Sequence, residues 1–264
     1  MRQSAAVAGP VSVGSAGPAP VWLTDNLPGV AENLALDELL LDSVHEGSLT
    51  VPVVRTWMAS SPTVVLGASS RVADEVDLAA CAAEGVEIVR RPSGGLTVIL
   101  GPGCLMWSVI APYPEGSPAI DTLHACMLEP LAAGLRSAGR AVVRRGASDL
   151  ALATTGNDEE ADLKVSGNAL RVRRQGVLYH GTLLDSFDLG LVDRVLRHPP
   201  REPGYRAGRP HGKFLANLGL GRERLEEVVR SAFNAVGGRV DWREERIAEM
   251  VRDRYASPSW THRL

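Results

Sequence analysis

The sequence has little of several features that mark common protein classes. Its 264 residues include three cysteines, Cys81, Cys104 and Cys126, whose spacing fits neither a disulfide framework nor a zinc site. The formal net charge is -3, without the basic excess of proteins that bind nucleic acid or membrane surfaces. No apolar run approaches the roughly 20 residues of a membrane span. We therefore expect reduced cysteines in a cytoplasmic protein that binds neither nucleic acid nor membrane.

The start of the chain lacks the features of a folded segment. Residues 1–20 contain no aromatic side chain and no apolar core of a secretory signal, and they are rich in Ala, Gly, Pro and Ser. We expect a disordered leader over 1–20 and one domain over 21–264, with no C-terminal accessory domain. That length suffices for one well-filled core. The sequence contains neither a Rossmann fingerprint nor a P-loop.

Hydrophobic periodicity predicts an α+β domain. Leucines at helical spacing indicate a helix from Asn33, and further helices are expected at 74–85, 119–138, 189–196, 222–236 and 243–255. Short β-rich runs indicate strands at 51–57, 63–67, 86–90, 96–100, 105–110, 141–145, 148–154, 161–173 and 176–186. Because strands and helices do not alternate regularly, we expect a mixed, mostly antiparallel sheet flanked by helices.

The stretch RRPSGG is the first candidate for chemistry. Arg90 and Arg91 precede Ser93, Gly94 and Gly95, and no acid in the stretch pairs the two cations. Glycine lets the backbone approach a ligand closely, and arginine adds a forked cation. The stretch therefore suits an anion, although glycine turns of this kind also simply connect strands.

Two further patches lie later in the chain. In DLKVSG, strand alternation places Lys164 on the same face as Ser166, opposite the apolar neighbours. In YHGTLL, His180 and Thr182 flank Gly181 near the end of a strand. Each patch also admits an ordinary structural role, either a lysine that reaches solvent or a hydrogen-bonded histidine.

Taken in order, RRPSGG, SDLAL, DLKVSG and YHGTLL resemble the motifs of the lipoate–protein ligase A family, within the biotin/lipoate ligase and octanoyltransferase superfamily. The resemblance runs from about Trp22 to RYASPSW at 254–260. It implies a catalytic domain like those of class II aminoacyl-tRNA synthetases and biotin ligases. It also implies attachment of lipoate or octanoate to a carrier lysine through an acyl-adenylate, with ATP and Mg²⁺ as cofactors and lipoate or lipoyl-AMP as substrate.

The resemblance also implies roles for individual residues. Lys164 is the expected catalytic residue, because a cation beside the reacting carbonyl and the phosphate stabilises developing charge. Nucleotide binding is expected from Lys164 together with Arg91, Leu96, Thr97, Val98, Ile99 and Asp149, the last with a weaker role at the metal. Substrate binding is expected from Arg90, Ser93, Gly94, Gly95, Ser166, Gly167, His180, Gly181 and Thr182. An acyl tunnel lined by Leu66, Val98 and Leu183 competes with ordinary core packing, the commoner role of such residues.

The chain departs from the family pattern at three places. Leu96 stands where a third glycine is usual, Leu100-Gly101 where a His-Asp pair is usual, and Cys104 where an asparagine is usual. Two other functions therefore stay open: an octanoyl or lipoyl transferase that uses a cysteine thioester, and a non-catalytic protein that binds an acyl group or carrier. The superfamily's transferase cysteine occupies one of two places, which correspond here to RRGASDL and Pro203. Neither holds a cysteine, which favours the ligase.

The resemblance indicates partners as well. The carrier is expected to be a lipoyl domain, from the E2 subunit of a 2-oxoacid dehydrogenase or the glycine-cleavage H protein. Without the further small domain of many relatives, the chain is expected either to need a separate accessory subunit or to use preformed lipoyl-AMP.

Overall fold

The computed structural model describes residues 18–112, 119–154 and 161–264. The predicted leader lies almost entirely outside the described residues. Within them no helix is both long and apolar enough to cross a membrane.

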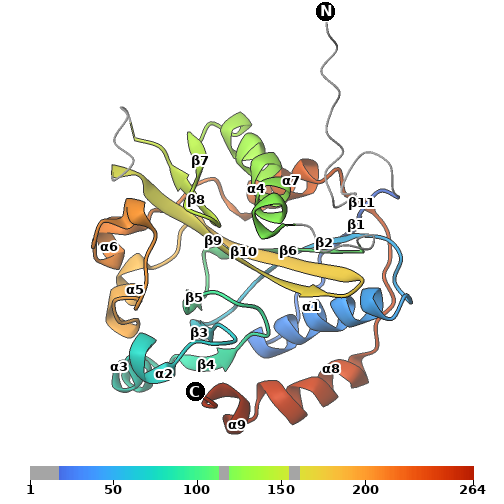
Figure 1. Cartoon of the computed structure of the whole chain (residues 1–264), viewed down its shortest axis with the longest axis horizontal. Helices are drawn as coiled ribbons and strands as arrows, with labels where there is room; N and C mark the ends of the chain where they lie inside the picture. The colour runs from blue at the N-terminus through green and yellow to red at the C-terminus, as the bar shows by residue number, and fades with distance from the viewer. Residues whose placement is uncertain (1–17, 113–118, 155–160) are drawn as a thin grey trace, which may run out of the picture.

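An eight-stranded sheet runs through the middle of the molecule (Figure 1). Its order is β11-β1-β2-β6-β10-β9-β8-β7, antiparallel except where β1 pairs with β2 and β11. The strands are β1 (Val21–Leu23), β2 (Val53–Met58), β6 (Cys104–Pro112), β7 (Val142–Arg145), β8 (Asp149–Leu152), β9 (Leu163–Arg173), β10 (Gly176–Leu184) and β11 (Val236–Gly237). The predicted α+β class with a mixed, mostly antiparallel sheet is confirmed.

Helices cover both faces of this sheet (Figure 1). On one face, α4 (Ile120–Ser137) and α7 (Arg222–Ala232) pack on each other and on the strands. On the other face lie α1 (Val30–His45), which contacts β6 and β10, and α8 (Glu244–Met250), which packs on α1. Two large clusters of buried apolar side chains result, one for each face, and a third, small cluster is formed by Ala151, Tyr205 and Phe214. The sheet therefore carries a core on both sides, so its central strands β2, β6 and β10 are buried along nearly their whole length.

A second, three-stranded sheet lies on the α1 side. Its order is β4-β3-β5, formed by β3 (Thr63–Leu66), β4 (Glu87–Arg90) and β5 (Val98–Leu100). Beside it lie α2 (Val72–Glu75), α3 (Leu78–Glu84) and α9 (Pro258–Thr261), the last in contact with β4 (Figure 1). α5 (Leu189–Val195) packs on α3 and on α6 (His211–Phe214). α6 and a 3₁₀ turn η2 (Gly204–Arg206) contact β8 and β9 of the large sheet. The RRPSGG stretch joins β4 to β5, so the small sheet holds this turn against the large one.

Two predicted helices are interrupted, each for a local reason. The helix expected at 74–85 is split into α2 and α3, because Val76 is extended and the Asp77 side chain caps α3 by accepting from the Ala80 N–H. Gly85 then ends α3 in the left-handed region, at φ 66°. The helix expected at 243–255 turns from α8 into a π-helical segment η3 (Val251–Tyr255), in which Tyr255 is buried against Glu38.

Candidate active site

A cavity of about 580 Å³ opens between the two sheets and the segment 196–215. Much of its wall is apolar, from Leu34, Val65, Val98, Ile99, Leu100, Met106, Leu184, Phe187, Val192, Leu196, Phe214 and Leu215. The polar groups come from the segment 91–97, from the β7–β8 turn, from β9 and β10, and from the segment 196–215, which contributes Arg201, Glu202, Arg206 and His211. An apolar chamber with a few polar groups is the usual form of a site for a small molecule with a hydrocarbon part.

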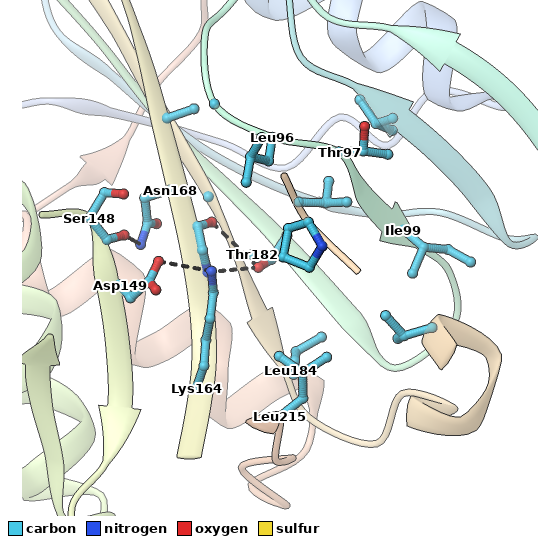
Figure 2. A pocket seen from close by; sticks show the side chains of 18 of the residues that line it. Leu96, Thr97, Ile99, Ser148, Asp149, Lys164, Asn168, Thr182, Leu184 and Leu215 are labelled. Atoms are coloured by element: carbon cyan, nitrogen blue, oxygen red, sulfur yellow. Dashed lines mark hydrogen bonds and ion pairs between the residues drawn. The ribbon is translucent and has the colours of Figure 1, made fainter. Parts of the chain in front are cut away.

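Lys164 and Asp149 form an ion pair in the cavity wall. The Lys164 Nζ lies 2.9 Å from Asp149 Oδ1, and Tyr205 donates its hydroxyl proton to Asp149 Oδ2 at 3.0 Å. Figure 2 shows Lys164 and Asp149 pointing towards each other, with Leu184 and Leu215 nearby. The Lys164 side chain is 25% exposed, so an ammonium held by one carboxylate still faces the space of the cavity.

A β-bulge brings this lysine into place. Leu150 pairs with Ser166 but Ala151 pairs with Lys164, which leaves Val165 as an extra residue in β9. The bulge reverses the alternation, so Lys164 lies over Gly167, where an added Cβ would be 3.0 Å from Lys164 Cε and Nζ. Ser166 does not line the cavity. The predicted common face of Lys164 and Ser166 is therefore wrong.

Lysine is rare in this chain. Of the 28 Lys and Arg residues, two are lysines, Lys164 and Lys213. Lys213 is exposed on α6 and does not line the cavity. A lysine ammonium is a compact point charge, whereas arginine is a broad planar fork, so the two cations act differently at a reacting centre. Lys164 thus differs from the other basic side chains that line the cavity, which include Arg91, Arg201 and Arg206.

The Arg91 side chain lines the same cavity as Lys164, but most of its donors bind the protein itself. Its Nη2 donates to the carbonyls of Gly94 and Leu96 at 2.7 and 2.9 Å, and its Nη1 donates to Val65 O at 3.1 Å. Burial lowers the pKa of Arg91 to about 10, so the side chain is still charged at neutral pH. Arg91 therefore supports the turn from inside, and the segment from Gly95 to Ile99 lines the cavity.

Arg90 lies elsewhere. Its side chain is fully buried, and it donates to the carbonyls of Gly67, Ser70, Trp260 and Thr261. These contacts anchor α9 to the small sheet. The structure does not bring Arg90 to the cavity. Its donors bind backbone carbonyls of the protein, whereas the sequence suggested that they bind an anion.

Most of the residues singled out from the sequence share this cavity. Those that line it are Arg91, Gly95, Leu96, Thr97, Val98, Ile99, Asp149, Lys164, Gly167, His180, Gly181 and Thr182. Those that do not are Arg90, Ser93, Gly94 and Ser166, together with the tunnel candidates Leu66 and Leu183, which are buried in the two core clusters. Sequence reasoning missed the wall formed by 196–215 and the contact of Tyr205 with Asp149, because no local pattern reports a contact 56 residues away.

The two places where the superfamily carries a transferase cysteine meet in space. A Cβ added at Gly146, in the RRGASDL segment, would lie 3.2 Å from Pro203 Cβ, and both residues line the cavity. Neither supplies a thiol. The three cysteines of the chain lie outside the cavity lining, and burial raises the pKa of each, for Cys104 to about 12. No activated thiolate is therefore available near Lys164.

The described residues do not form a protein-held metal site. No group of three or more His, Cys, Asp or Glu side chains within them is placed to hold an ion. Asp149, the candidate ligand, uses both carboxylate oxygens for Lys164 and Tyr205. Magnesium does not fit this acid in the arrangement described, and we derive no step through it.

Comparisons with known proteins agree with this architecture. The family model of the lipoyl protein ligase A/B catalytic domain matches residues 29–219. An octanoyltransferase LipM of Symbiobacterium thermophilum is 31% identical over 271 residues, covering 91% of this chain and 96% of the relative. Another, of Kyrpidia tusciae, is 28% identical over 261 residues, covering 88% and 94%. A structure described as a bi-partite lipoate protein ligase and its E2 lipoyl domain from Thermoplasma acidophilum superposes with a TM-score of 0.77 at 20% identity, covering 92% of this chain and 96% of that one.

Proposed function

The chain belongs to the lipoyl protein ligase A/B catalytic-domain family, and from this premise we propose that it attaches lipoate or octanoate to a carrier lysine through an acyl-adenylate. In the first step the acyl carboxylate attacks the α-phosphate of ATP and releases pyrophosphate. In the second, the neutral carrier amine attacks the acyl carbonyl, the bond to phosphate oxygen breaks, and AMP leaves.

The observation that carries this proposal is the position of Lys164. Its ammonium stands at the wall of a largely apolar cavity that has no thiol in its lining. An acyl-adenylate has an apolar tail, a reacting carbonyl and an anionic phosphate, and one cation beside the last two groups stabilises the charge that develops in both steps. A thioester route needs a thiolate as nucleophile and leaving group, and none is present.

Other residues of the site have supporting parts. Asp149 holds the ammonium of Lys164 on one side, with Tyr205 fixing the carboxylate. Thr182 accepts from the Gly167 N–H at 3.2 Å and keeps β9 and β10 together beneath the lysine. The backbone from Gly95 to Ile99 is the proposed surface for nucleotide and phosphate, and the apolar wall is the proposed surface for the acyl chain.

A second candidate, octanoyl transfer between carrier proteins, is favoured by a separate observation. The relatives from Symbiobacterium thermophilum and Kyrpidia tusciae that match nearly the whole chain are named octanoyltransferases. In this chain such a transfer would have to be direct, from donor thioester to acceptor amine, with Lys164 stabilising the oxyanion. The acceptor in either case is proposed to be a lipoyl domain, the type of domain named for the Thermoplasma acidophilum ligase.

The two candidates differ in the acyl donor they require. The purified chain is incubated with an isolated lipoyl domain and one of four donors: lipoate with ATP, octanoate with ATP, preformed lipoyl-AMP, or octanoyl acyl carrier protein. The mass gain of the lipoyl domain and ATP–pyrophosphate exchange are both measured. ATP–pyrophosphate exchange together with a mass gain of the lipoyl domain supports the ligase. A mass gain with lipoyl-AMP as the only effective donor supports the second step of the ligase reaction alone. A mass gain from the carrier thioester alone would replace the ligase by the transferase.

A further inference from the structure

A buried chain of hydrogen bonds runs from α1 to the RRPSGG turn through β10. The Ser93 hydroxyl lies 2.6 Å from His180 Nε2, and it also accepts from Arg91 Nε at 3.0 Å. On its other side, His180 Nδ1 faces Asp37 Oδ2 at 3.8 Å. We propose that His180 is a positioning residue: as a neutral imidazole in one tautomer, it holds the turn at 91–97 in the conformation that binds the nucleotide and phosphate. The inference deepens the function proposed above and rests on it.

The carboxylate of Asp37 indicates the tautomer. Its Oδ2 can only accept, so the ring nitrogen that faces it, Nδ1, carries the proton. In the neutral ring Nε2 is then an acceptor, and the Ser93 hydroxyl, whose oxygen accepts from Arg91 Nε, donates its own proton to it. Neither Nδ1 nor Asp37 Oδ2 has another hydrogen-bond partner among the described residues. A contraction of about 1 Å would turn their 3.8 Å separation into a hydrogen bond.

The charges around the ring favour its neutral form. His180 is 3% exposed, and Arg91 lies on the side of the turn. Asp37 faces the ring from α1, but its other oxygen is already paired with the buried Arg55 of β2 at 2.8 Å. Burial first, and then Arg91, lower the pKa of His180, which the facing Asp37 only partly offsets. A neutral ring can accept from the Ser93 hydroxyl, whereas an imidazolium could only donate to the Ser93 oxygen, which reverses the bond.

The contact between His180 and Ser93 stabilises the conformation of the turn. The imidazole ring bonds to Ser93, and Ser93 bonds to Arg91 Nε. The two Nη atoms of the same guanidinium donate to the carbonyls of Gly94 and Leu96 and of Val65 in β3. The Ser93 carbonyl in turn accepts from the Ala68 N–H at 2.8 Å. Losing the His180 contact would therefore loosen the backbone that faces the cavity, while the apolar core on the opposite face of the large sheet stays intact.

The first test needs no substrate. The ¹⁵N shifts of His180 in the intact protein should show a neutral ring with the proton on Nδ1 between pH 6 and 8. The variant His180→Phe should speed amide exchange at Ala68 and in the 93–97 turn, by about tenfold for the loss of one buried hydrogen bond. His180→Gln should restore slow exchange, because its amide oxygen can accept from Ser93.

His124 offers a matched control. It is likewise a buried histidine bonded to a hydroxyl, with Nδ1 2.8 Å from the Tyr179 oxygen, but it lies on α4 at the other face of the sheet. His124→Phe should leave exchange in the turn unchanged. With lipoyl-AMP as donor, His180→Phe should raise KM more than it lowers kcat, and Ser93→Ala should add nothing further in the double variant, since both remove the same link.

Two results would overturn the proposal. One is a ring protonated at Nε2 or at both nitrogens in the intact protein. The other is exchange that rises equally in the turn and on α4, which would mean general destabilisation. If the chain shows no acyl transfer at all, the measurements of amide hydrogen exchange and of the His180 tautomer remain valid. Failure of the proposed function and failure of the proposed role of His180 can therefore be told apart.

Discussion

The substitution Lys164→Met tests the central role of the ammonium. Methionine keeps the length and the apolar stem of the side chain but removes the charge that lies 2.9 Å from Asp149. Losing one preorganised group at a reacting centre commonly lowers kcat by about 10² to 10³, equivalent to about 3–4 kcal/mol. The acyl-binding wall is unchanged, so the KM for lipoyl-AMP should change less than kcat.

The same substitution has a separate effect on stability. Asp149 is 7% exposed and would keep only the Tyr205 hydroxyl as a partner. Leaving a nearly buried carboxylate without its cation costs about 1–3 kcal/mol, which for a chain of this size lowers Tm by several degrees. Adding Asp149→Asn removes the stranded charge. The double variant should therefore regain stability without regaining acyl transfer.

The assay is steady-state transfer from preformed lipoyl-AMP to a lipoyl domain, followed by mass spectrometry to obtain kcat and KM, with Tm measured in parallel. Lys213→Met is the matched control, because it removes the chain's other lysine from an exposed position outside the cavity. Lys213→Met should leave acyl transfer and Tm unchanged. The reasoning is refuted if Lys164→Met retains more than about a tenth of the transfer rate, or if the double variant recovers the rate.

Three other outcomes follow from the geometry. Gly181→Ala should lower the free energy of unfolding by about 1–3 kcal/mol through overpacking, because the added Cβ would lie 1.7 Å from Asn168 Oδ1. A denaturant midpoint equal to that of the unchanged protein would contradict this. Arg90→Met should release α9 and cost at least about 1–3 kcal/mol, since several buried carbonyls lose their donor. Hydrogen exchange should then rise first at the C-terminal end, and loss of acyl transfer with unchanged stability would instead support a role in binding. Burial lowers the pKa of His180 below its ordinary value of 6.5, so the unfolded chain binds the proton at a higher pH than the folded chain does. The free energy of unfolding should therefore fall as the pH drops below 6.5. Burial raises the pKa of Asp42, which acts in the opposite sense, so the test is whether His180→Gln flattens the slope of chemical-denaturation stability between pH 7 and 5.

Much of the fold was accessible from local patterns. Apolar spacing predicted α1, α4, α5 and α7 closely, since an amphipathic helix repeats its pattern over neighbouring residues. The strands β9 and β10 were likewise predicted almost to their ends, because they are long and bounded by turn residues. The very short elements β11, α6 and α9 were not predicted, because pieces of two to four residues have no period to detect.

The sequence by itself determined the family, the class of fold and the part of the cavity lining that the four motifs carry, because each motif places polar or small residues at short fixed spacings. The tertiary structure decided what those residues do. It turned Arg90 into an anchor for α9, bound Arg91 to backbone carbonyls, and set His180 between Ser93 and Asp37. The bulge at Val165 then moved Lys164 onto the face of Gly167. The contacts of Arg90 and His180 join residues far apart in the chain, and short-range spacing carries no information about them. The contacts of Arg91 and the bulge in β9 depend on how the turn and the strands pack, which spacing also does not report.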